Sequence, residues 1–159
     1  MAAAAAAAAE AEAVAVFATR TVQGTVLCRQ EKRGVVIEAQ FAKLPPGQHG
    51  FHIHRAGDLR GEGCLGACDH FHKGQPTVHG GPPGTTKYRH TGDLGNISGH
   101  TKYIFLLEGL KVSELFGRSF IVHADPDDYG MGEEADSATT GHSGKRIACA
   151  IIGRGLACK

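Results

Sequence analysis

The chain of 159 residues has no tryptophan, few aromatic residues (6%) and almost no net charge. Its 17 basic and 16 acidic side chains nearly cancel, which leaves a formal net charge of +1. A nucleic-acid-binding surface needs a clear excess of positive charge, so we expect no nucleic-acid partner. The apolar runs are far shorter than the roughly 20 residues of a membrane-spanning helix, so we also expect no membrane partner.

Residues 1–12 begin with a polyalanine tract that has no apolar face to pack against a core. We therefore expect a disordered extension here and a single domain over residues 13–159. The start of the chain also lacks the basic residues and the bulky apolar centre of a signal peptide, which favours a cytoplasmic protein.

The cysteines do not have the sequence spacing that is typical of a metal site. The five cysteines are an odd number without a CxxC pair, which excludes zinc-ribbon and thioredoxin-type motifs. Intracellular thiols usually stay reduced, but the residues alone leave one long-range disulfide open. The cysteines are Cys28, Cys64, Cys68, Cys149 and Cys158.

The 23 glycines and the short apolar runs broken by Gly, Pro and Asp favour an all-β fold of short strands. Between the expected strands lie two long irregular stretches, 55–95 and 124–144, and loops of that length usually need a function or a metal to organise them. We expect strands at residues 13–19, 24–29, 35–42, 49–54, 102–107, 118–123 and 146–154.

Histidine, in contrast, is abundant and patterned, and it is the commonest side-chain metal ligand near neutral pH. On a strand over residues 49–54, His52 and His54 point to the same face and can share one metal ion. His49 lies on the opposite face, where we expect it to bond to the backbone. His72, His100 and His142 are expected to be exposed loop residues, with His72 a stray ligand only under metal excess.

Two ligand sets of different chemistry follow from the remaining histidines. His70, His79 and His90 with Asp93 offer three imidazoles and a carboxylate, which suits tetrahedral Zn²⁺. His52 and His54, together with His123 and one further histidine, offer an all-nitrogen set that suits Cu²⁺. The residues predict two metals that share the available ligands.

Ten short motifs, in this order and at these spacings, resemble the copper/zinc superoxide dismutase family from about Val14 to Gly153. They are HGFHIH (49–54), GD (57–58), Cys64, HF (70–71), HGGP (79–82), RHTGDLGN (89–96), VH (122–123), DD (127–128), TGHSGKRIAC (140–149) and IIG (151–153). The resemblance implies an eight-stranded Greek-key β-barrel of immunoglobulin-like sandwich architecture, with long metal-binding and electrostatic loops.

The resemblance also implies one copper and one zinc per subunit and the conversion of superoxide anion to dioxygen and hydrogen peroxide. It implies that copper binds His52, His54, His70 and His123, and that zinc binds His70, His79, His90 and Asp93. His70 would bridge the metals and pass on a proton, and Arg146 would dock the anion. Asp127 would orient two ligand histidines, and Cys64 would pair with Cys149, unless Cys68 competes.

Several positions depart from the family pattern. Arg55-Ala56 and Arg154 replace apolar contacts of the usual subunit interface, and the segment between Asn96 and His123 is short. We therefore expect a weaker or rearranged homodimer, or a monomer. Thr139 replaces a lysine that guides the anion in many relatives, but Lys145 beside Arg146 should maintain electrostatic steering.

Two alternatives of other classes remain. One is a copper chaperone or an inactive metal-binding relative on the same barrel, and the other is a metal buffer or zinc-stabilised structural protein. The chain has no added CxC tail and keeps His123 and Arg146, which favours the enzyme. A copper chaperone is then a candidate partner.

Overall fold

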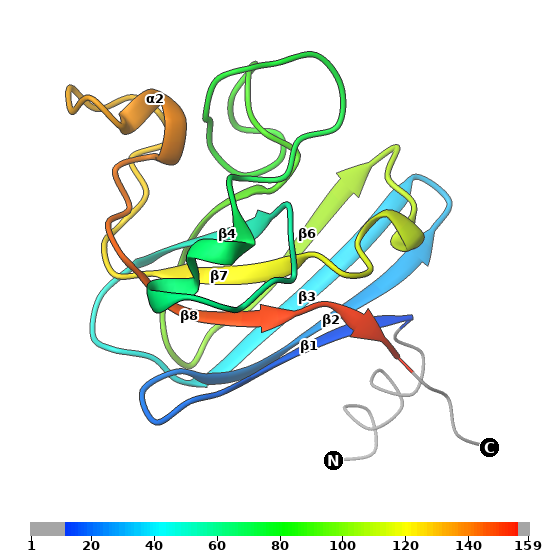
Figure 1. Ribbon diagram of the computed structural model, residues 1–159. Helices are drawn as coiled ribbons and strands as arrows, with labels where there is room; N and C mark the ends of the chain where they lie inside the picture. Colours follow the sequence, from blue (N-terminus) through cyan, green and yellow to red (C-terminus); the bar gives the residue numbers. More distant parts are fainter. Residues whose placement is uncertain (1–11, 156–159) are drawn as a thin grey trace.

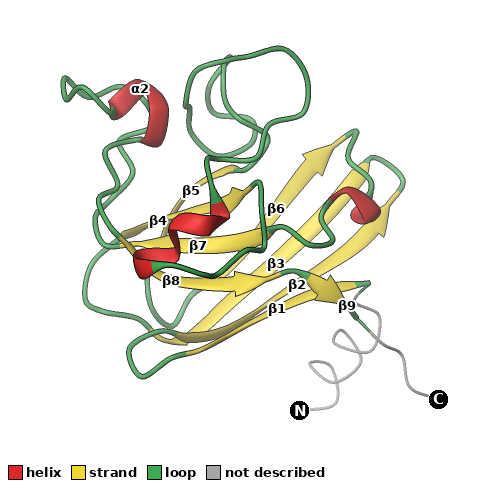
Figure 2. Ribbon diagram, in the orientation of Figure 1, coloured by secondary structure: helices red, strands yellow, loops and turns green. Residues whose placement is uncertain are grey.

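The computed structural model describes residues 12–155, which form two antiparallel sheets that face each other (Figure 1, Figure 2). Residues 1–11 and 156–159 lie outside the described part, and with them nearly all of the expected disordered extension and Cys158. Within the described residues, no helix is both long and apolar enough to cross a membrane.

The first sheet has five strands in the order β6-β3-β2-β1-β9. Its side chains alternate between core and solvent, as in Ala13, Ala15 and Phe17, which are buried while their neighbours are more exposed. The strands are β1 (Ala13–Ala18), β2 (Gln23–Glu31), β3 (Gly34–Lys43), β6 (Lys102–Glu108) and β9 (Gly153–Arg154).

The second sheet has four strands in the order β5-β4-β7-β8 and carries the histidine-rich strand β4. These strands are β4 (His49–His54), β5 (Asp93–Ile97), β7 (Ser119–His123) and β8 (Arg146–Ile151). Three short helical segments lie in the connections: η1 (Glu62–Ala67), η2 (Val112–Glu114) and α2 (Ser137–Thr140).

A row of phenylalanines joins the two sheets through the core. Phe41 of β3 packs 5.7 Å from Phe51 of β4 in an edge-to-face arrangement, and Phe51 stacks 5.3 Å from Phe120 of β7. Such aromatic pairs stabilise a fold by about 0.5–1.5 kcal/mol each beyond their area burial. The odd-numbered side chains of β4 therefore anchor the strand, and its even-numbered histidines point away from the core.

All seven strands expected from the sequence are present, but β5 was not expected. The alternation of apolar and polar side chains is not visible in its sequence, because β5 begins with the buried carboxylate of Asp93 and contains Gly95 at φ +79°. The strand also pairs with β4 through a register shift. The last expected strand is divided at Ile152, where the chain passes from the second sheet to the first. The all-β sandwich predicted from the sequence is therefore confirmed. It has nine strands in the described residues, and its two sheets do not close on each other there.

Candidate metal centre

Four histidines from three parts of the chain meet on the outer face of the second sheet. His52 and His54 lie on β4, His123 ends the adjacent strand β7, and a single β-bridge holds His70 beside His54. All four are buried, and their ligand atoms lie within 4.8 Å of one another. We call these residues the four-histidine cluster.

A second group, the carboxylate cluster, consists of His70, His79, His90 and Asp93 and therefore shares His70 with the first. Asp93 Oδ1 lies 2.8 Å from His70 Nδ1 and 3.1 Å from His79 Nδ1, and Oδ2 lies 3.2 Å from His90 Nδ1. The backbone N–H groups of Gly80 and His90 also donate to Oδ2. Three imidazole nitrogens thus converge on one fixed carboxylate.

Whether these groups fit metal ions is tested by asking which of their buried polar atoms have hydrogen-bond partners. In residues 12–155, five buried side-chain nitrogen atoms have no hydrogen-bond partner, and all five belong to the two clusters. Buried polar groups almost always have partners, so these nitrogens are available to bind metal ions. They are His52 Nδ1, His54 Nε2, His70 Nε2, His79 Nδ1 and His123 Nε2; His79 Nδ1 lies 3.1 Å from Asp93 Oδ1 but without the geometry of a hydrogen bond.

The other ring nitrogen of most of these histidines is held by an acceptor. His54 Nδ1–H donates to the carbonyl of Cys68 (2.7 Å), and His123 Nδ1–H donates to that of Gly144 (3.1 Å). One carboxylate, Asp127, accepts from both His52 Nε2 (2.7 Å) and His79 Nε2 (2.8 Å). Such contacts fix the tautomer and turn the free nitrogen towards the ligand position.

Asp127 is itself held by Asn96 at the end of β5, a role that the sequence analysis did not assign. The Asn96 amide donates to the Asp127 carbonyl (2.9 Å), and its oxygen accepts the Asp127 backbone N–H (2.6 Å). The only sequence signal was the position of Asn96 at the end of the RHTGDLGN motif (89–96). Because β5 was not expected, nothing placed it opposite Asp127.

The two clusters have different electrostatics. Burial and the neighbouring histidines lower the pKa of His54 to about 2 and that of His123 to about 3, so both are neutral and able to bind a metal. Burial also opposes the charge of His79, but its contacts with Asp127 and Asp93 outweigh burial and raise its pKa to about 9. Contacts with three histidines hold the pKa of Asp93 well below its usual range despite burial.

Arg146 lies at a cavity of about 500 Å³ above the four-histidine cluster. Its guanidinium donates to the carbonyls of Cys64 (2.8 Å) and Cys68 (2.7 Å), on the segment that a Cys64–Cys149 disulfide ties to β8. Cys68 is therefore left as an exposed free thiol. The cavity is also lined by His54, His70, His123, Asp69 and Thr139.

The family model for copper/zinc superoxide dismutase matches residues 22–152, which is most of the chain. The chain belongs to the copper/zinc superoxide dismutase family. A Cu-Zn superoxide dismutase of Paramecium bursaria Chlorella virus 1 is 46% identical over 140 residues, which cover 83% of this chain and 73% of the relative. An extracellular Cu-Zn superoxide dismutase of Brugia pahangi is 39% identical over 141 residues, 82% of this chain and 69% of the relative.

Two further proteins are similar to this member of the copper/zinc superoxide dismutase family over most of its length. A copper chaperone for superoxide dismutase of Rattus norvegicus is 42% identical over 139 residues, but these are 84% of this chain and only 49% of the chaperone. The crystal structure of the clock protein EA4 is 35% identical, with a TM-score of 0.78, and covers 91% of this chain and 95% of that one.

Four histidines of this superoxide dismutase fold lie outside the two clusters. His49 bonds to the backbone carbonyls of His123 and Pro45 (both 2.9 Å), as expected. His100 and His142 are exposed, also as expected. His72 differs, because it is half-buried: its Nε2–H donates to the Gln75 carbonyl and its Nδ1 accepts the Thr91 backbone N–H (3.2 Å).

Proposed function

We propose that this protein is a copper/zinc superoxide dismutase that converts two superoxide anions and two protons into dioxygen and hydrogen peroxide. The observation that carries the proposal is the pair of histidine clusters that share His70 and contain all five unpaired buried nitrogens of residues 12–155. Family membership supports the same function.

We assign copper to the four-histidine cluster and zinc to the carboxylate cluster. Four imidazole nitrogens without a carboxylate suit copper, whereas three imidazoles and Asp93 suit tetrahedral zinc. His70 supports this division because it presents Nε2 to one cluster and Nδ1 to the other. Asp127 is proposed to orient His52 and His79, one ligand from each cluster.

When bound, copper would supply a one-electron redox couple and zinc a fixed positive charge. Arg146 provides a permanent cation at the cavity that leads to the four-histidine cluster, where a small anion can dock. Its position is fixed by the two carbonyls that accept from it, so little reorganisation is needed when an anion arrives. Arg146 is therefore proposed to bind and orient superoxide.

His70 is proposed to move the proton. Its Nε2 is buried and has no hydrogen-bond partner, and His70 is one of the residues that line the same cavity as Arg146. Nδ1 is fixed by Asp93 at 2.8 Å, so the ring keeps its orientation whether Nε2 is bare or protonated. A proton held at His70 Nε2 would thus lie in the wall of the cavity that admits the anion.

Four further features belong to the same proposal. Residues 13–159 would act as one domain, and subunit pairing would be weaker than in the family or rearranged. A cytoplasmic location is proposed from the sequence analysis, although two relatives are named extracellular, and cell fractionation tests it. A separate copper chaperone is a proposed partner for metal loading.

The experiment combines metal analysis with a superoxide-decay assay on the purified full chain. The wild type should bind one copper and one zinc and dismutate superoxide, and His123→Ala should lose copper and activity together. His100→Ala, which removes an exposed histidine, is the matched control and should change neither. A wild type that is fully loaded with copper but inactive, or that only passes copper to another protein, would overturn the proposal in favour of a chaperone.

A further inference from the structure

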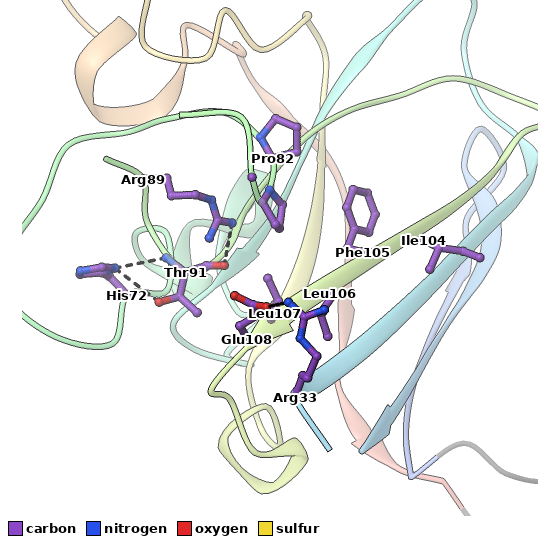
Figure 3. A pocket seen from close by; sticks show the side chains of 12 residues that line it. Arg33, His72, Pro82, Arg89, Thr91, Ile104, Phe105, Leu106, Leu107 and Glu108 are labelled. Atoms are coloured by element: carbon purple, nitrogen blue, oxygen red, sulfur yellow. Dashed lines mark hydrogen bonds and ion pairs between the residues drawn. The ribbon is translucent and has the colours of Figure 1, made fainter. Parts of the chain in front are cut away.

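A cavity of about 770 Å³ lies between the outer edge of β6 and the loop that joins β4 to β5 (Figure 3). It is separate from the cavity of Arg146, because the two have no lining residue in common. Its volume is in the range of pockets that bind small molecules, roughly 300–1,000 Å³. The proposed function does not use this cavity, so its chemistry can indicate a further ligand.

One positive charge in the lining is not balanced by an acidic side chain. The cavity has two arginines and one carboxylate, Glu108, and this carboxylate forms an ion pair with Arg33 at the rim. Arg89 is half-buried and forms no ion pair within residues 12–155. Asp93 is close to it, but the Asp93 carboxylate is in contact with three histidines. A negatively charged ligand would therefore balance the charge of Arg89.

Backbone carbonyls hold the Arg89 guanidinium in place and leave one of its nitrogens free. Nε donates to the carbonyl of Gly81 (3.1 Å), and Nη2 donates to the carbonyls of Thr91 (3.1 Å) and Asp93. Nη1 has no hydrogen-bond partner among the described residues. Its two N–H groups are available to an acceptor in the cavity, and a guanidinium that is already fixed loses little conformational entropy on binding.

The outer edge of β6 adds neutral hydrogen-bond donors to the cavity. Gly109 N–H donates to the carbonyl of Arg33, and β6 pairs with β3 without a register shift, so the backbone of Leu107 bonds to β3. The backbone groups of Ile104 and Leu106 point the other way, because bonding alternates along an antiparallel pair. In the part of the chain that the structure describes, no backbone hydrogen bond joins them to the facing loop.

The polar and the apolar groups of the lining lie on different sides. Figure 3 shows Arg89, Thr91 and His72 on one side of the cavity and Ile104 and Phe105 on the other. Ile104 is 65% exposed, so an apolar group that covers it would gain from the surface it removes from water. This arrangement fits a small ligand with a charged group at one end and an apolar body at the other.

We propose that this cavity binds a small organic carboxylate. The carboxylate would accept hydrogen bonds from Arg89 Nη1 and from the edge N–H of Leu106, and the apolar body would lie over Ile104. A carboxylate carries one negative charge, which matches the one unbalanced charge of Arg89, whereas a phosphate monoester carries about 1.5 to 2. A neutral ligand of the same shape would lack the charge-assisted hydrogen bond.

The test is an NMR titration of the full chain with benzoate, in the reduced copper- and zinc-loaded form, whose Cu⁺ and Zn²⁺ ions are both diamagnetic. Benzoate should shift the amide resonances of Ile104 and Leu106 saturably, with a dissociation constant of about 1 mM or lower. Benzamide has the same shape without the charge, and acetate has the charge without the apolar body. Each should bind about tenfold more weakly or worse.

Two variants of Ile104 with opposite charge form a matched pair, since this side chain is exposed and contributes little to the core. Ile104→Glu should weaken benzoate binding by about threefold or more, and Ile104→Lys should strengthen it by a similar factor, because the added charges act on the carboxylate in opposite senses. A structural defect would weaken binding in both. Arg89→Gln should weaken it by about tenfold or more.

The proposal is wrong if benzoate causes no saturable shift at these two amides, if shifts occur only around Arg146, or if benzamide binds as tightly as benzoate. A change of the same sign in Ile104→Glu and Ile104→Lys would also contradict it. Superoxide decay should be unchanged in both variants, because Ile104 lies outside the metal centre. Failure of this proposal and failure of the proposed function are therefore distinguishable.

Discussion

The four-histidine cluster and the carboxylate cluster use the same residue type in opposite electrostatic settings. Burial lowers the pKa of His54 to about 2 and of His123 to about 3 in the first, whereas contacts with Asp127 and Asp93 raise the pKa of His79 to about 9 in the second. One buried carboxylate, Asp93, is the main difference between them. Ligand charge, rather than histidine number, therefore distinguishes the two sites.

The clusters also differ in the structure that holds them. Three of the four-histidine residues lie on the adjacent strands β4 and β7, while His79 and His90 lie on the long connection between β4 and β5. The first cluster is built by the core of the sheet, and the second is assembled by hydrogen bonds around Asp93. His70 belongs to both clusters, so a substitution at this residue should affect both.

The largest effect is expected from His70→Ala, which removes the residue that the two clusters share. Copper and zinc affinity should fall together, and activity should fall by more than about 100-fold, because loss of a residue behind a ligand alone costs 10–100-fold. Metal content and superoxide decay measure this. Retention of both metals at wild-type affinity would mean that His70 is not shared.

The second-largest effect is expected from a substitution that should weaken metal binding in only one of the two clusters. Asp93→Asn keeps the side-chain shape but removes the charge on which three histidines converge, so zinc affinity should fall by about 100-fold or more. Copper affinity should change much less, since no residue of the four-histidine cluster other than His70 contacts Asp93. Competition with chelators for each metal is the measurement, and equal losses for both metals would refute the division.

A third prediction concerns the support of the four-histidine cluster. Cys149→Ser should reduce the free energy of unfolding by about 2–5 kcal/mol, because the 85-residue separation between Cys64 and Cys149 is closed by their disulfide. It should also loosen the carbonyls that hold Arg146 and His54. Denaturant unfolding checks this, with Cys68→Ser, which replaces an exposed free thiol, as a control that should stay near the wild type.

The smallest effect is the pH dependence of the metal-free protein. Folded His79 keeps its proton up to about pH 9, whereas an unfolded histidine loses it near 6.5, so this stabilisation is complete below pH 6.5 and disappears as pH rises through 9. His54 and His123 act in the opposite sense, because they stay neutral when folded, and their contribution is lost as pH falls from 6.5 towards 3.

Stability in the presence of chelator should therefore be highest near pH 6.5 and fall on both sides, by up to about 1.4 kcal/mol per pH unit for each proton involved. Urea unfolding at a series of pH values measures this curve. His79→Gln should flatten the alkaline side and leave the acidic side. An unchanged alkaline side in this variant would show that His79 is not the group responsible.

The sequence was most informative where the side-chain alternation was regular. It predicted seven strands and the common face of His52 and His54, because period-two patterns are local. It did not predict β5, since a buried Asp93 and Gly95 interrupt that pattern. The roles of Asn96 and of His72 were also missed, because both depend on contacts between segments 19 or more residues apart.

The most direct test of the central claim is anomalous scattering from crystals of the copper- and zinc-loaded protein, recorded at both metal absorption edges. The account predicts copper among His52, His54, His70 and His123, and zinc among His70, His79, His90 and Asp93, with His70 between the two peaks. Zinc in the four-histidine cluster with copper beside Asp93, or a single metal that leaves one cluster empty, would contradict it.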